Sequence, residues 1–172
     1  MFYLQLFRAL AKQKVRYLLV GGVAVNLHGA ERMTMDVDLM LAMDAKNLER
    51  FRAVARSLRL APAVLPVTLE QFCDPKIVAS WVRDKHMLAF QLRGPELEAP
   101  SVDILVKPVV PFQSAYRRRK RMKVEGVSIS VAASEDLIAL KSGTGRKIDE
   151  SDILALRRLR RLRGRKRGKG NS

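Results

Sequence analysis

The chain has 172 residues, and its 33 lysines and arginines against 17 acidic residues give a formal net charge of +16. This length fits one domain with a substantial core, and an apolar fraction of 48% argues against wholesale disorder. The longest apolar run, residues 17–25, is far shorter than the roughly 20 residues that a membrane helix needs. The first residues lack the features of a signal peptide, so we expect a cytoplasmic protein without a membrane partner.

The positive charge is concentrated in two segments. Residues 116–123 hold six cations and no acid, and residues 157–169 hold nine more and no acid. Without these 15 cations, 18 basic residues remain against 17 acidic ones, a formal charge of +1. The segments are interpreted either as solubilising surface or as attraction to phosphate backbones, although they lack the interleaved aromatics that support base stacking.

Apolar periodicity predicts helices and strands that interleave along the chain. In chain order we expect a helix at 2–12, a strand at 15–20, a helix at 23–28 ending at Gly29, a strand at 35–43, a helix at 45–58 with Asp44 as N-cap, a loop at 60–67, a short helix at 68–72, strands at 86–92 and 101–106, a hairpin of 122–124 and 127–131, a helix at 135–142 capped by Ser134, and a last helix from Asp149 or Ser151 to about Leu162. This order predicts one α/β (α+β) domain over residues 1–162, with a small mixed sheet flanked by helices, followed by a disordered basic tail at 163–172.

Histidine, cysteine and tryptophan offer little chemistry. Cys73 is the only cysteine, which excludes an internal disulfide and a cysteine-based zinc site, and we expect a small core residue. His28 and His86 have no metal-ligand spacing and are expected to be packed or at the surface. Trp81 is expected to anchor packing, with acceptor or base stacking as the minority alternative.

Three carboxylates lie in apolar strand sequences, Asp36 and Asp38 in one and Asp103 in another. Side chains at i and i+2 of a strand point to the same face, so Asp36 and Asp38 project together. Unpaired carboxylates are costly to bury and repel one another, and a divalent cation such as Mg²⁺ or Mn²⁺ relieves both problems. The alternative, which is common for Asp-X-Asp alone, is carboxylates at strand ends that are solvated or paired with Arg32.

A Gly21-Gly22 pair separates a predicted strand from a predicted helix. Glycines permit close backbone approach, and a helix N-terminus favours phosphate. Neither the Walker pattern nor the Rossmann fingerprint occurs in the chain. Alone, the glycine pair indicates a tight turn. Followed by Asp36-Val37-Asp38, which begins fourteen positions after Gly22, it becomes a more specific signal of a phosphate-binding site.

Taken together, these segments resemble the DNA polymerase beta superfamily of nucleotidyltransferases, most closely its minimal members and the type IV abortive-infection toxin nucleotidyltransferases. The resemblance rests on Gly21-Gly22, the run Arg32-x-Thr34-x-Asp36-x-Asp38, and the Val102-Asp103-Ile104 strand. A later segment is similar to the family's helix lysine followed by Arg/Lys-x-Asp-x-x-Asp, here Lys141, Lys147, Asp149 and Asp152.

The resemblance implies transfer of NMP from an NTP to an acceptor with release of pyrophosphate. It implies two Mg²⁺ or Mn²⁺ ions held by Asp36, Asp38 and Asp103, with Asp103 also helping to deprotonate the acceptor. It assigns nucleotide binding to five residues: Gly21, Gly22, Arg32, Thr34 and Lys141. A surface lysine on an amphipathic helix is the equally weighted alternative for Lys141. For Arg146, Asp149 and Asp152, ion pairs that orient this helix are one interpretation and a simple capped start of the last helix is the other.

The acceptor is left open. RNA or tRNA comes first, a protein hydroxyl in a toxin–antitoxin system is close behind, and a small molecule such as an aminoglycoside is third. Two alternatives belong to other classes: a non-catalytic RNA-binding module on the same fold, and a protein that binds a cognate toxin or antitoxin.

Overall fold

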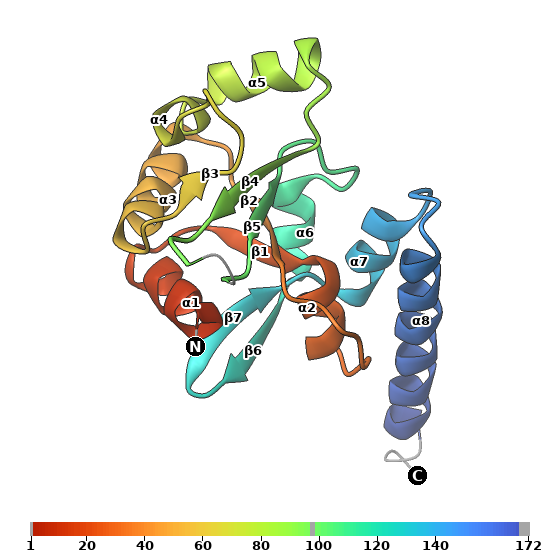
Figure 1. The fold of residues 1–172 in the computed structure, drawn as a ribbon. Coiled ribbons are helices and arrows are strands. Elements are labelled where there is room, and N and C mark those ends of the chain that lie inside the picture. Colours follow the sequence, from red (N-terminus) through yellow and green to blue (C-terminus); the bar gives the residue numbers. More distant parts are fainter. Residues whose placement is uncertain (1, 97–98, 169–172) are drawn as a thin grey trace.

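The computed structural model of the chain describes residues 2–96 and 99–168. These residues form a seven-stranded mixed sheet in the order β3-β4-β5-β2-β1-β7-β6, with helices packed around it (Figure 1). The strands are β1 Tyr17–Val20, β2 Val37–Leu41, β3 Ala61–Pro62, β4 Ala89–Arg93, β5 Val102–Leu105, β6 Lys120–Val124 and β7 Val127–Val131. The predicted α/β class with a mixed sheet is confirmed.

The helices occupy the connections between the strands. They are α1 Phe2–Lys12, α2 Gly21–Leu27, α3 Ala45–Ser57, α4 Leu69–Phe72, α5 Pro75–Asp84, α6 Phe112–Arg118, α7 Ser134–Lys141 and α8 Lys147–Gly168. Helix α1 packs against α3 and β7, whereas α7 lies between α2 and α8 (Figure 1). Within the described ranges, no helix is both long enough and apolar enough to span a bilayer.

Three central strands bring the predicted carboxylates together. Strand β2 runs antiparallel to β1 with Val20 opposite Asp38, and parallel to β5 with Asp38 opposite Asp103. Most residues of these strands are buried, and helices α2 and α6 pack against them. Asp38, Asp103 and Leu105 are half-buried exceptions.

Two helices were missing from the prediction. Helix α5 begins with Asp74, whose side chain accepts the amide hydrogens of Lys76 and Ile77, followed by Pro75 at the first helical position. The sequence Asp-Pro is a typical start of a helix, but residues 73–85 were not predicted to be helical. Helix α6 covers 112–118, and its seven residues are too few to show a clear apolar period.

The last two helices also differ from the prediction. Helix α7 is capped by Ala133 without a side-chain bond, because the Ser134 hydroxyl bonds the His28 ring instead. Helix α8 begins at Lys147, before Asp149, and continues to Gly168 rather than ending near Leu162. Arginine and lysine are good helix formers, which explains the extension through Gly164. Residues 169–172 of the predicted tail lie outside the described residues.

Candidate active site

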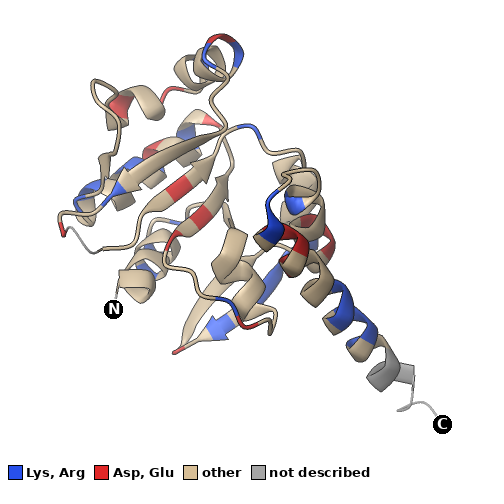
Figure 2. Ribbon diagram, turned by 45° about the vertical axis from the view of Figure 1, so that its right-hand side comes forward, with Lys and Arg blue, Asp and Glu red and all other residues tan. Residues whose placement is uncertain are grey.

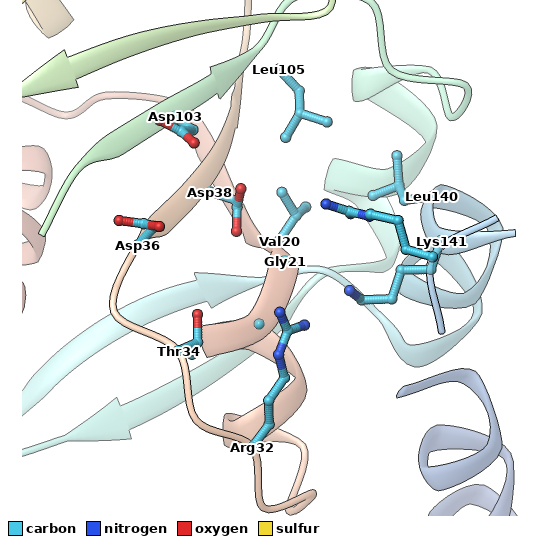
Figure 3. Close-up of a pocket in the computed structure, with 12 residues that line it drawn as sticks. Val20, Gly21, Arg32, Thr34, Asp36, Asp38, Asp103, Leu105, Leu140 and Lys141 are labelled. Atoms are coloured by element: carbon cyan, nitrogen blue, oxygen red, sulfur yellow. The ribbon is translucent and has the colours of Figure 1, made fainter. Parts of the chain in front are cut away.

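A cavity of about 220 Å³ lies where β1, β2 and β5 meet the loop after α2 and the end of α7 (Figure 3). Its lining is Val20, Gly21, Gly22, Arg32, Thr34, Asp36, Asp38, Asp103, Leu105, Leu140, Lys141 and Arg146. The structure therefore brings all eight residues of the predicted site to one cavity. The carboxylates occupy the sheet wall, and Arg32 and Lys141 face them from the other side (Figure 3).

The carboxylate wall carries concentrated negative charge. Asp38 and Asp103 are neighbours on parallel strands, and Asp36 precedes the first residue of β2 rather than lying within the strand. Burial, with the charge of Asp103 next, raises the pKa of Asp38 to about 6. Burial also raises the pKa of Asp103, and the charge of Asp36 adds to the effect. The site thus holds negative charge at an electrostatic cost.

Ser101 supports this wall and was not identified from the sequence. Its hydroxyl lies 2.8 Å from Asp36 Oδ1 and 3.3 Å from Asp103 Oδ1, so its single hydrogen serves one carboxylate at a time. Its backbone N–H also points to Asp36 Oδ1, at 3.3 Å. Ser101 stands two positions before Asp103, on the same strand face, and this i, i+2 relation was the available signal.

The two glycines fit against the polar side chains of the cavity. Gly21 has φ +64°, and a Cβ built there would lie 1.8 Å from Asp38 Oδ2. A Cβ on Gly22 would lie 2.8 Å from Thr34 Oγ1 and 3.0 Å from Arg32 Cζ. The pair therefore does more than make a tight turn, because it leaves room for the carboxylate and for the Arg32–Thr34 segment.

The cationic side is held by the start of α8. Arg32 Nη1 donates to Asp152 Oδ2 at 2.5 Å, and Lys141 Nζ lies 2.9 Å from the same oxygen. Lys141 also donates to Asp149 Oδ1 at 2.7 Å and is only 7% exposed, so it is not a surface lysine. Arg32 therefore pairs with Asp152 and not with the carboxylates of the Asp-X-Asp motif, which was the alternative.

Asp149 collects three donors. Besides Lys141, the Thr144 hydroxyl donates at 2.8 Å and Arg146 Nε at 2.6 Å. Burial acts to raise the pKa of Asp149, but these hydrogen bonds outweigh it and hold the pKa below its usual value. The ion pairs expected of Arg146, Asp149 and Asp152 are present, and they fix α8 to α7.

A divalent cation suits the donor chemistry of the carboxylate wall. Within residues 2–96 and 99–168, no group of three or more His, Cys, Asp or Glu side chains is arranged to hold a metal ion as it stands. Nevertheless the ligands on offer are all oxygens, and the raised pKa values of Asp38 and Asp103 reflect burial and repulsion that a cation relieves. Hard ions such as Mg²⁺ and Mn²⁺ match this set.

The remaining chemistry-bearing side chains are structural. Trp81 is buried and stacks on Phe90 with ring centroids 6.0 Å apart, as expected of a packing anchor. His28 is buried between Ala132 and Ser134. Cys73 is a half-buried free thiol whose pKa burial raises to about 11. None of them lines the cavity.

Solved structures share this fold. The lincosamide antibiotic adenylyltransferase LnuA, in a lincomycin-bound crystal structure, is similar with a TM-score of 0.58 and 18% identity over 92% of this chain and 94% of its own. The enzyme ANT(2")-Ia, in complex with adenylyl-2"-tobramycin, has a TM-score of 0.57 and 12% identity over 98% and 96%. An antigenic nucleotidyltransferase-like protein from Paracoccidioides brasiliensis has 0.56 and 18% over 88% and 71%.

The sequence by itself finds no relatives of this kind: no family model matches, and no curated protein matches. The structural likeness nevertheless extends over nearly the whole chain. The chain therefore has the nucleotidyltransferase fold, and the fold implied by the sequence resemblance is confirmed.

Proposed function

We propose that this protein is a metal-dependent nucleotidyltransferase that transfers NMP from an NTP to an acceptor hydroxyl and releases pyrophosphate. One observation carries the proposal: three carboxylates and two cationic side chains face each other across one cavity beside a Gly-Gly turn. Such a cavity matches the charge pattern of a metal-bound triphosphate, with oxygen ligands on one side and phosphate counter-charges on the other.

The residues divide the work by charge. Asp36, Asp38 and Asp103 would hold Mg²⁺ or Mn²⁺, and two such ions, when bound, activate the attacking hydroxyl and offset charge on the leaving pyrophosphate. Ser101 holds Asp36 and Asp103 in place through its hydroxyl. Asp103 would also take the proton of the acceptor hydroxyl.

The nucleotide would lie against the opposite wall. Gly21 and Gly22 let its phosphates approach the backbone, and Thr34 offers a hydroxyl beside Gly22. Arg32 and Lys141 supply positive charge toward the phosphates. Arg32 Nε is buried and has no hydrogen-bond partner in the described part of the chain, so a donor remains for a phosphate oxygen.

The reaction is tested by incubating the protein with each α-labelled NTP, Mg²⁺, total RNA and cell extract, and asking which species becomes labelled. The double variant Asp36→Asn, Asp38→Asn should lose transfer by about 100-fold or more, because charge at the reacting phosphate is no longer balanced. Asp84→Asn, at an exposed aspartate at the end of α5, is the matched control and should keep parental activity. Equal labelling by parent and double variant contradicts the proposal.

For the acceptor we propose RNA or tRNA first and a protein hydroxyl next, in a toxin–antitoxin setting with a cognate partner. The basic segments and the sequence resemblance support this order. Incubation in extract separates the two, because nuclease removes label from RNA and protease removes it from protein. Co-purification of a neighbouring gene product from the native operon tests the partner. A non-catalytic RNA-binding module is the alternative, and it predicts RNA binding without any labelled product.

A small hydroxylated antibiotic is the third candidate acceptor. The neighbours LnuA and ANT(2")-Ia were solved with lincomycin and with adenylyl-2"-tobramycin. In this chain a second cavity of about 360 Å³ shares Asp36 with the first and is bordered by Arg93, Glu96 and Ser101. Lincomycin and tobramycin added to the labelled reaction test it directly: a labelled drug product supports this acceptor, and its absence with labelled RNA present excludes it.

A further inference from the structure

Helix α8 presents a row of arginines away from the domain. Leu154, Arg157, Arg158 and Arg161 follow the i, i+3, i+4, i+7 spacing of one helix face, and all four are exposed. Arg160 lies beside them and, with Leu154, Arg157 and Arg161, borders a shallow groove of about 590 Å³. Among the residues that the structure describes, none of these arginines forms an ion pair with a carboxylate.

The opposite face of α8 fixes this row in space. Asp149, Asp152 and Leu156 are buried against the rest of the domain. Farther along, Arg163 Nη2 donates to the carbonyl oxygen of His28 at 2.8 Å, so the basic part of the helix is tied to the end of α2. Figure 2 shows the cations along the part of α8 that projects past the sheet.

The second basic segment reaches the same region. Lys120, Arg121 and Lys123 are exposed on β6, which is an edge strand of the sheet. Lys120 lies opposite Val131, next to the Ala132 carbonyl that the His28 ring contacts at 2.8 Å. The positive charges of both Arg163 and Lys120 act on His28. One residue of each basic segment, Arg163 of α8 and Lys120 of β6, thus lies near the C-terminal end of α2.

The arginine row begins beside the proposed active site. Asp152 holds Arg32 and Lys141 at the cavity, and Arg161, the last arginine of the row, lies nine residues farther along the same helix. At about 1.5 Å of rise per residue, the row therefore ends roughly 14 Å along the helix from Asp152. A chain of anions bound along it would have one end near the carboxylates.

A polynucleotide fits this surface better than the other polyanions. Guanidinium groups match phosphate oxygens in pairs, and an acid-free row favours a repeating charge. A stable acidic protein partner requires an apolar interface core, but Leu154 is the only apolar side chain bordering the groove within the described residues. A lipid surface requires a continuous apolar helix face. Leu156 of α8 is buried in the domain, and the exposed apolar residues Ile148, Leu154 and Leu162 lie six or more residues apart along the helix.

We infer that the arginine row of α8 docks the phosphate backbone of a single-stranded polynucleotide whose terminal hydroxyl is the acceptor. This inference rests on the proposed function for the role of that hydroxyl, but the docking surface itself does not. Binding and transfer are therefore measured separately.

The test compares two variants of equal charge change. In the first, Arg157, Arg158, Arg160 and Arg161 are each changed to Gln. In the second, four exposed lysines on the α1, α3 and α5 side of the molecule are changed to Gln: Lys12, Lys46, Lys76 and Lys85. Binding of a 5′-fluorescent single-stranded RNA is followed by anisotropy between about 50 and 200 mM salt, and circular dichroism confirms that each variant is folded.

The arginine variant should bind at least about tenfold more weakly than the parent, with a salt slope smaller by about 3, since each phosphate contact on a single strand contributes about 0.7. The lysine variant should bind like the parent. Equal weakening of both variants, or binding insensitive to salt, overturns the inference. So does competition by polyglutamate as effective as that by unlabelled RNA, because that result assigns the surface to an acidic protein.

The double variant Asp36→Asn, Asp38→Asn separates the two proposals. It should bind RNA no more weakly than the parent, because its positions are outside the arginine row. If RNA docks but no parental sample labels it from any NTP, the proposed transfer fails while the docking surface stands. If RNA becomes labelled equally by parent and arginine variant, the docking surface is wrong while the transfer stands.

Discussion

Gly21 shows how closely the site is packed around one carboxylate. It directly follows β1 and has a left-handed conformation, with φ +64°, beside the strand that carries Asp38. Two separate constraints therefore act on this position. The backbone needs a residue that tolerates positive φ, and the Asp38 carboxylate needs the space that a Cβ would fill.

We expect Gly21→Ala to destabilise the protein more than a glycine substitution that meets only the first constraint. Gly126, in the β6–β7 turn, has φ +78° and nothing within 4 Å of its Cβ position. Gly126→Ala should cost about 1–2 kcal/mol of unfolding free energy from the backbone alone. Gly21→Ala should add about 1–3 kcal/mol of overpacking and displace Asp38, so NMP transfer falls as well.

Urea unfolding of both variants measures the difference, and a transfer assay of both measures the displacement. Equal destabilisation by the two substitutions would show that the Asp38 side chain moves freely out of the space that a Cβ at position 21 would fill, contrary to this prediction.

For individual residues, the sequence predicted which side chains lie together in the site, but not which hydrogen bonds and ion pairs they form with one another. Residue type and spacing identified Asp36, Asp38 and Asp103, because carboxylates are conspicuous in apolar strands. Ser101 escaped, because a serine at the start of a strand is unremarkable until its hydroxyl is seen between two carboxylates. Lys141 was ambiguous for the same reason, since its burial depends on Asp149 and Asp152 from a later helix.

Helix α2 joins several elements through a single side chain. The buried His28 at its C-terminal end lies 2.8 Å from the Ala132 carbonyl after β7 and 3.2 Å from the Ser134 hydroxyl on α7. Since a carbonyl only accepts, Nε2 carries the hydrogen in this arrangement and Nδ1 accepts from Ser134. The neutral ring is thus the form that satisfies both neighbours.

We therefore expect His28 to make folding weaker at acidic pH. Burial, opposed by the Ala132 bond and reinforced by the positive charge of Arg163, holds the pKa of His28 below its ordinary 6.5. As pH falls below that value, the unfolded chain takes up the proton first, so stability present at neutral pH is lost by up to about 1.4 kcal/mol per pH unit. The loss ends once pH passes the lower pKa of the folded protein.

Urea unfolding of the parent and of His28→Gln between pH 7 and pH 5 tests this slope. Glutamine can keep both bonds, through its amide hydrogen and its carbonyl oxygen, but it has no proton to gain. The variant should therefore show a flatter profile, whereas His86→Gln, at an exposed turn, should retain the parental slope. A parental slope in His28→Gln would assign the pH dependence to other groups.

Helices and strands could be predicted where the sequence has a clear capping residue or a clear apolar periodicity. They were missed where charged residues dominate the segment. Helix α1 has the predicted bounds, and Asp44 caps α3 as expected. Helix α6 was not predicted because it has only seven residues, FQSAYRR, too few to show a clear apolar period before the arginines at its end. The length of α8 was missed because a basic sequence was equated with disorder, although lysine and arginine favour helix and its first turns are fixed by buried ion pairs.

For the whole molecule, the formal charge of +16 describes two opposite local environments. The cavity wall concentrates carboxylates, and the outer surface along α8 and β6 concentrates cations (Figure 2). Because Arg163 and Lys120 both lie near the end of α2 and further cations follow in each segment, like charges repel there, most strongly within a Debye length of about 10 Å at 0.1 M salt. The folded state therefore carries an electrostatic cost that the unfolded chain largely avoids.

We expect salt to stabilise the protein for this reason. Raising NaCl from about 0.05 M to about 0.5 M should raise the melting temperature, by roughly 2–4 °C for each kcal/mol of repulsion that is screened. The variant with Gln at 157, 158, 160 and 161 should gain less from salt, because the repulsion was removed beforehand. The variant with Gln at 12, 46, 76 and 85 loses the same formal charge but should gain nearly as much as the parent. Equal changes in melting temperature for the two variants would mean that the salt dependence is set by the net charge and not by where the positive charges lie on the surface.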